Sequence, residues 1–125
     1  MTQKEFLSTL LRKNKKTIIV GSLGTISNDL QDIPHNHKIL VKGAMGCVIG
    51  VGLGIALSIK GKVVVIIGDG ACLMKVGSLA TVNKYKPKNL DIIVLNNNKF
   101  NSCGGQETNF KYICKSLPAI KIKNI

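Results

Sequence analysis

Five consecutive β-branched residues, Val63 to Ile67, form the clearest element in the hydrophobic pattern. Such a run predicts a strand that is buried on both faces, as in a parallel sheet. A second apolar run, Ile92 to Leu95, predicts another buried strand. Between them, residues Ser78 to Tyr85 predict a helix that ends before Pro87. Strand, crossover helix and strand in this order imply parallel pairing with a right-handed connection.

The rest of the chain fits the same α/β pattern, with apolar positions at helical or strand spacing and small or polar residues between them. In chain order the predicted elements are a helix with Leu7, Leu10 and Leu11 that ends in the basic run Arg12 to Lys16, a strand from Thr17 to Val20 closed by Gly21, a short helix capped by Ser27 and reaching Leu30, a strand from His37 to Val41, and a helix from Cys47 to Ile59.

Length and charge limit the function classes. The chain has 125 residues, 45% of them hydrophobic, which suits one globular domain with its own core. Its 18 lysines and arginines against 6 acidic residues give a net charge of +12. Arg12 is the only arginine and aromatic residues make up 4%, so the charge favours a lysine-rich surface over a nucleic-acid interface. An anionic small molecule suits the charge equally well.

An uncharged stretch from Gly43 to Ile59 is near the lower limit for a membrane span, roughly 17–25 residues. Glycines interrupt it and a strand follows at once, so a buried helix is the simpler interpretation, and we expect no membrane partner. The four cysteines have no CxxC pair and no zinc-ligand spacing, which indicates reduced thiols in a cytoplasmic protein. They are Cys47, Cys72, Cys103 and Cys114.

Oxygen-bearing residues follow both buried strands. Asp69 comes directly after the first strand and Asn97 after the second. The carboxyl ends of parallel strands form the ligand-binding edge of such a sheet, and neighbouring strands lie about 5 Å apart. Carboxylate, amide and loop carbonyl oxygens are ligands that Mg²⁺ prefers. Taken singly, however, Gly68-Asp69-Gly70 is also a plain turn and the asparagine run a plain loop.

The spacing of these motifs resembles a known signature. Gly68-Asp69-Gly70, then 25 residues, then Asn96-Asn97 is similar to the thiamine diphosphate motif. Residues 17 to 108 resemble the diphosphate-binding half of the thiamine diphosphate-dependent 2-oxo acid decarboxylases, especially those acting on phosphonopyruvate and sulfopyruvate. The segments that carry the likeness are Gly43 to Gly46, Gly68 to Val82, Lys86 to Leu90 and Ser102 to Thr108.

The resemblance implies an open, mainly parallel sheet with helices on both faces, here apparently short of the family's full C-terminal part. It also implies roles for individual residues. Asp69, the Asn97 side chain and the Lys99 backbone carbonyl would hold Mg²⁺, which would hold the diphosphate. The cofactor itself would contact residues of four segments: Gly24, Thr25 and Ser27; the Gly43 carbonyl; Met45, as an apolar wedge; and Gly68, Gly70 and Ala71. For Met45, core packing is the alternative.

The implied reaction is decarboxylation of a 2-oxo acid. The preferred substrate is phosphonopyruvate, which would give phosphonoacetaldehyde and CO₂. The alternative is that the chain is a β-type subunit of a sulfopyruvate decarboxylase. Three departures from the family bear on it. Cys47 stands where phosphonopyruvate decarboxylases often carry His, and Asn98 and Asn101 where relatives commonly have Gly and an acid. The family's activating Glu lies on a pyrimidine-binding domain, and this chain has only Glu5 and Glu107.

We therefore expect a partner domain or α-type subunit that supplies this Glu, in a hetero- or homo-oligomer, and no turnover by this chain alone. A rival of another class is a non-catalytic fragment or a basic binding module. A nicotinamide-binding site at Gly50, Gly52 and Gly54 is disfavoured because their spacing differs from GxGxxG and they lie inside a helix pattern.

Overall fold

All five strands lie in one parallel sheet, which confirms the predicted parallel pairing. The computed structural model describes residues 1–125, and its strand order is β2-β1-β3-β4-β5, with every neighbouring pair parallel. The strands are β1 (Ile18–Gly21), β2 (Lys38–Leu40), β3 (Val63–Gly68), β4 (Leu90–Asn96) and β5 (Lys121–Asn124).

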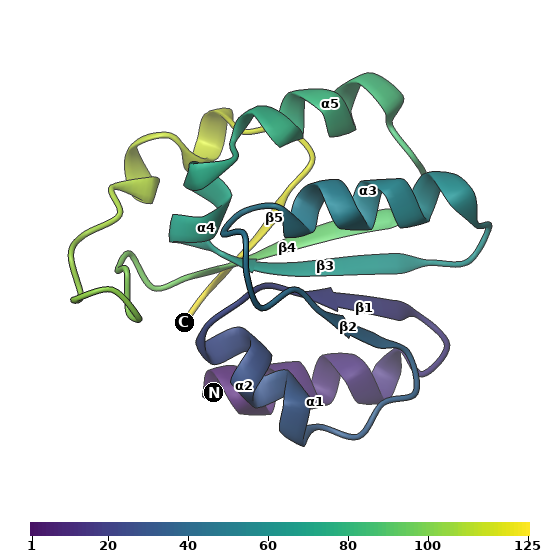
Figure 1. Ribbon diagram of the computed structural model, residues 1–125. Helices are drawn as coiled ribbons and strands as arrows, with labels where there is room; N and C mark the ends of the chain where they lie inside the picture. The colour runs from purple at the N-terminus through teal and green to yellow at the C-terminus, as the bar shows by residue number, and fades with distance from the viewer.

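Helices cover both faces of the sheet, which confirms the expected architecture (Figure 1). On one face lie α1 (Gln3–Lys13) and α2 (Thr25–Asp32), and on the other α3 (Val48–Ser58), α4 (Asp69–Met74) and α5 (Gly77–Tyr85). Side chains of a strand alternate between faces. In β3, Val64 and Ile66 accordingly belong to the core under α1 and α2, and Val65 to the core under α3 to α5.

The uncharged stretch forms α3 in its larger part, so a helix is present as predicted, but only one side of it is buried: Val51 and Leu57 are exposed. Gly50, Gly52 and Gly54 lie within this helix and do not open it. A Cβ at Gly52 would be 2.1 Å from Val65 Cγ2, so the absence of a side chain lets α3 pack directly on β3. No helix of the structure has both the length and the apolar character that a membrane crossing requires.

The prediction that Ser27 caps the second helix is wrong. The N-cap is Gly24, whose φ of 80° lies in the region that glycine adopts without strain. Ser27 lies inside α2, buried, and its hydroxyl donates a hydrogen bond to the Ser22 carbonyl at 2.5 Å. The helix therefore begins earlier than expected because the tight turn after β1 needs glycine more than a polar cap.

Two further parts of the chain differ from the prediction. Gly68-Asp69-Gly70 is no free turn, because β3 runs to Gly68 and α4 begins at Asp69. Beyond β4, the chain forms two short 3-10 helices (Phe110–Tyr112 and Cys114–Ser116) and then β5, none of which was predicted in detail. The other predicted elements are present, with ends that shift by a few residues.

The strand order creates a switch point between β1 and β3. From β1 the chain crosses outward to β2, while β3, β4 and β5 follow one another in the opposite direction. Crevices at the carboxyl ends of such strands are the ligand-binding places of open α/β sheets. The Ser22 N–H donates to the Ile66 carbonyl at 2.9 Å, which holds the loop after β1 against β3.

Candidate functional site

A cavity of about 80 Å³ lies at the switch point, outside the carboxyl ends of β1, β3 and β4. Nine of the predicted site residues line it: Gly24, Thr25, Met45, Gly68, Asp69, Gly70, Ala71, Asn97 and Lys99. Ser27 and Gly43 do not. Pockets that bury a small-molecule ligand usually measure roughly 300–1,000 Å³, so this chain encloses part of such a ligand at most.

Asp69 has the only carboxylate side chain at the cavity and it is buried, with 2% of its surface exposed. It occupies the first turn of α4, and its Oδ2 accepts a hydrogen bond from Thr108 Oγ1 at 2.5 Å. No lysine, arginine or histidine forms an ion pair with it. This side chain therefore lacks a counter-charge within the chain. Burying a charged carboxylate costs free energy unless it is paired or coordinates a metal.

The residues after β4 come to the same cavity. Asn97 Oδ1 accepts a hydrogen bond from the Lys99 N–H at 3.0 Å, which fixes the start of the loop. Asn98 has a φ of 60°, a backbone conformation that favours glycine. Its Oδ1 is buried and accepts no hydrogen bond. The loop then closes on itself through an antiparallel bridge between Lys99 and Glu107.

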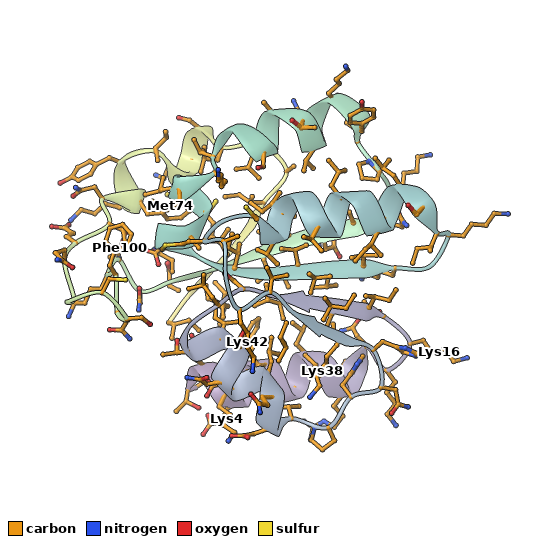
Figure 2. The ribbon with its side chains drawn as sticks, viewed as in Figure 1. Lys4, Lys16, Lys38, Lys42, Met74 and Phe100 are labelled. Carbon is orange, nitrogen blue, oxygen red and sulfur yellow. The ribbon has the colours of Figure 1, made fainter.

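Phe100 forms part of the cavity wall and was not among the predicted site residues. Its ring lies against Gly70, where a Cβ would be 2.6 Å from Phe100 Cε1. Figure 2 shows this side chain at the end of the sheet where β3 passes into α4. The signal in the sequence was an aromatic residue inside a polar, glycine-rich loop. Asn101, Ser102 and Cys103 of that loop line the cavity as well.

The amino end of α2 faces the same space. Its cap is Gly24 and no side chain caps it, so the helix itself leaves the N–H groups of Thr25 and the next two residues without partners. Gln3 of α1, which the sequence did not point to, also lines the cavity and donates from Nε2 to Thr25 Oγ1 at 3.3 Å and to Asp29 Oδ2 at 2.9 Å. Such an uncapped helix end is suited to an anion.

The loop before α3 brings Met45 to the cavity. Met45 is partly buried: it packs against the core on the α3 side and also lines the cavity. Gly43 lies exposed in the same loop, outside the cavity. A Cβ at Gly46 would be 2.7 Å from the Ala71 carbonyl oxygen, so this glycine lets the loop approach α4. Cys47 is half-buried at the cap of α3.

Neither glutamate of the chain reaches the cavity. Glu5 closes the capping box of α1 with Thr2, and Glu107 is exposed and pairs with Lys111 at 2.9 Å. All four cysteines are free. Burial, with the nearby Asp69 charge in addition, raises the pKa of the Cys72 thiol to about 11. No group of three or more His, Cys, Asp or Glu side chains lies together, so a metal here would depend on amide and carbonyl oxygens besides Asp69.

The sequence matches a known family of domains. The sequence profile of the family described as "Thiamine pyrophosphate enzyme, C-terminal TPP binding domain" matches residues 9–123. The chain belongs to this family.

Individual relatives are decarboxylases. "Sulfopyruvate decarboxylase subunit beta" of Methanocaldococcus jannaschii is 38% identical over 95 residues, which cover 75% of this chain and 50% of that protein. The subunit of the same description from Methanococcus maripaludis is 37% identical over 109 residues, 86% of this chain and 59% of the relative. "Phosphonopyruvate decarboxylase" of Streptomyces viridochromogenes is 41% identical over 103 residues, 82% and 25% respectively. The chain thus spans about half the length of the β subunits and a quarter of the last protein.

Proposed function

We propose that this chain binds the diphosphate of thiamine diphosphate through Mg²⁺ and contributes one half of the active site of a 2-oxo acid decarboxylase. The observation that carries the proposal is Asp69, a buried carboxylate without a cationic partner at the cavity where Asn97 and Lys99 also lie. The family to which the chain belongs supports the cofactor. The metal and the residue roles come from the resemblance to the family, and the cavity lining supports nine of these residues.

The donor set suits Mg²⁺. Asp69 would supply the carboxylate, Asn97 its amide oxygen and Lys99 its backbone carbonyl, all hard oxygen ligands. Asn97 Oδ1 already accepts from the Lys99 N–H. An amide oxygen has a second lone pair, so this hydrogen bond orients Asn97 without occupying it fully. The bound ion would provide the counter-charge that Asp69 lacks.

The diphosphate itself would lie at the amino end of α2. Free N–H groups and the helix dipole stabilise an anion there, and Gly24 keeps the approach free of a side chain. The exposed Thr25 hydroxyl adds a donor. On the other side of the ion, Gly68, Gly70 and Ala71 would bring backbone close to the phosphates. Ser27 would contribute its backbone N–H only, because its hydroxyl is used within the fold.

The loop before α3 would receive the other part of the cofactor. In this proposal the Gly43 carbonyl accepts a hydrogen bond from the ring amino group, and Met45 supports the cofactor with an apolar surface. Met45 lines the cavity, whereas Gly43 lies outside it on the exposed side of the loop. The ring would therefore extend beyond the cavity that this chain encloses, toward a second domain.

A partner chain completes the site. The cavity has no carboxylate side chain except that of Asp69, and both glutamates are engaged elsewhere. We propose that a pyrimidine-binding domain or α-type subunit supplies the activating Glu. The description of similar chains as β subunits supports an assembly of unlike chains. Turnover then requires both chains.

When bound, thiamine diphosphate accepts the electron pair that the departing CO₂ leaves on the carbonyl carbon. The chain's own residues would hold the diphosphate and keep water away from one side of the substrate. Lys99 is the only lysine or arginine that lines the cavity, and its charge suits an anionic substrate.

Two substrates fit this chemistry. Phosphonopyruvate is the first candidate, giving phosphonoacetaldehyde and CO₂, supported by the relative that is 41% identical. Sulfopyruvate is the second, because chains described as β subunits of its decarboxylase match 75% and 86% of this one. Both are pyruvates that carry an anionic tetrahedral group.

The test mixes this chain with a chain that carries the pyrimidine-binding domain, adds thiamine diphosphate and Mg²⁺, and measures CO₂ and aldehyde from each substrate. We expect turnover of at least one substrate by the pair and none by either chain alone. A folded pair that releases no aldehyde from either substrate contradicts the decarboxylase proposal and favours a non-catalytic or basic binding role.

A further inference from the structure

Thr108 connects the two halves of the candidate metal site. Its Oγ1 donates a hydrogen bond to Asp69 Oδ2 at 2.5 Å, although 39 residues separate them in the chain. Its N–H donates to the Asn98 carbonyl at 3.0 Å. One residue therefore links the carboxylate that follows β3 to the loop that follows β4.

Thr108 is itself held firmly. Only 6% of it is exposed, and its Oγ1 accepts a longer hydrogen bond, 3.4 Å, from the Phe110 N–H. The Phe110 side chain is completely buried in the same core as Ala71 and Cys72 of α4. Because the hydroxyl accepts from the backbone on one side, its own proton is directed to Asp69.

The methyl group of Thr108 has a separate contact. A Cβ at Gly70 would be 3.4 Å from Thr108 Cγ2, so the methyl packs beside the glycine that follows Asp69. Hydroxyl and methyl thus touch neighbouring residues of the same turn. The two contacts can be removed one at a time, because valine keeps the shape of threonine and serine keeps the hydroxyl.

We propose that Thr108 is the positioning residue of the metal site: its hydroxyl fixes the carboxylate of Asp69 so that the other oxygen faces the cavity, and its backbone sets the loop that carries Asn97 and Lys99. The inference rests on the proposed function for the identity of the cation. Partners of this kind, which orient a metal ligand without touching the metal, commonly change metal affinity by about 10–100-fold.

The experiment measures Mg²⁺ affinity by titration calorimetry, with Mg²⁺ added to the full chain of 125 residues in the absence of thiamine diphosphate, because the free diphosphate would itself bind the ion. Thr108→Val is expected to weaken Mg²⁺ binding by about 10–100-fold, and Thr108→Ser to stay close to the wild type. The matched control is Thr17→Val, since Thr17 is also buried but precedes β1, at the opposite end of the sheet. It should leave Mg²⁺ affinity unchanged.

Wild-type affinity in Thr108→Val overturns the inference, and so does a Thr108→Ser loss as large as that of Thr108→Val, because the methyl would then be the important group. If the valine variant does not fold, Thr108→Ala replaces it, and wild-type affinity in that variant overturns the inference equally. A wild-type chain that binds no Mg²⁺ contradicts the proposed function and the role of Thr108 with it. Unchanged binding in the variants contradicts the role of Thr108 alone.

Discussion

Phe100 fills the space that a side chain at Gly70 would need: a Cβ on Gly70 would be 2.6 Å from the Phe100 ring. The contact joins the first turn of α4 to the loop that carries Asn97 and Lys99. The wall of the cavity therefore depends on the absence of one methyl group.

Gly70→Ala is expected to displace Phe100 and to destabilise the fold by about 1–3 kcal/mol, the usual cost of overpacking. Binding of thiamine diphosphate and Mg²⁺ should weaken as well, because the loop moves. Urea denaturation and calorimetry measure the two effects. Gly77→Ala is the control, since its Cβ would meet nothing within 4 Å. Adding Phe100→Ala to Gly70→Ala should restore part of the stability; if it restores none, the ring is not the obstacle.

Two glycines of α3 should respond in opposite ways to alanine. A Cβ at Gly52 would be 2.1 Å from Val65, whereas one at Gly50 would meet nothing within 4 Å. Gly52→Ala should lower the free energy of unfolding by about 1–3 kcal/mol through overpacking. Gly50→Ala should raise it by up to about 1 kcal/mol, because alanine is the better helix former. Denaturant titration measures the free energy of unfolding of both variants. Equal changes in the two variants would refute the close packing of α3 on β3.

Asp91 gives a pH-dependent prediction away from the cavity. Burial alone would raise the pKa of Asp91, but hydrogen bonds from Lys121 and Lys62, together with their charges, outweigh burial and hold its pKa below the usual value. The pairs measure 3.2 Å each and bind β5 and the start of β3 to β4. Asp91→Asn should therefore cost about 1 kcal/mol near neutral pH.

The sign of the pH dependence follows from the lowered pKa. Ionised Asp91 stabilises the folded chain above the pKa of an unfolded aspartate, about 3.9, and this contribution is lost as the pH falls through the lower folded value. The difference in stability between Asp91→Asn and wild type should be constant from about pH 5 to 7 and should disappear below about pH 4. Thermal unfolding across this range measures it. A difference that grows on acidification would contradict the ion pairs.

The buried strands and the residues at their carboxyl ends could be predicted from the sequence because they depend on local patterns. Five β-branched residues specify β3 almost alone, and Asp69 and Asn97 follow from parallel pairing. The start of α2 could not be predicted from Ser27, because the turn after β1 requires the positive φ of Gly24. β5 was missed because Ile122 is its only apolar residue and lies between two lysines, and only pairing with β4 makes this segment a strand.

The residues that hold the site in place could not be predicted from the sequence either. Thr108 lies in a segment that carried the family likeness, but nothing local shows that its hydroxyl reaches Asp69, 39 residues away. Phe100 likewise gains its place from the missing Cβ of Gly70. Conversely, Gly43 and Ser27 were assigned by likeness to the family, and the fold leaves them outside the cavity. Side-chain contacts between distant segments decide these positions.

The central claim is that Asp69 holds the Mg²⁺ that anchors thiamine diphosphate. Calorimetric titration of thiamine diphosphate into the chain, with Mg²⁺ or with EDTA, tests it most directly when wild type, Asp69→Asn and Asp91→Asn are compared. We predict that thiamine diphosphate binds only with Mg²⁺. Its affinity should be unchanged in Asp91→Asn and at least tenfold weaker in a folded Asp69→Asn. Binding that survives EDTA, or that is as tight in Asp69→Asn as in wild type, would contradict the account.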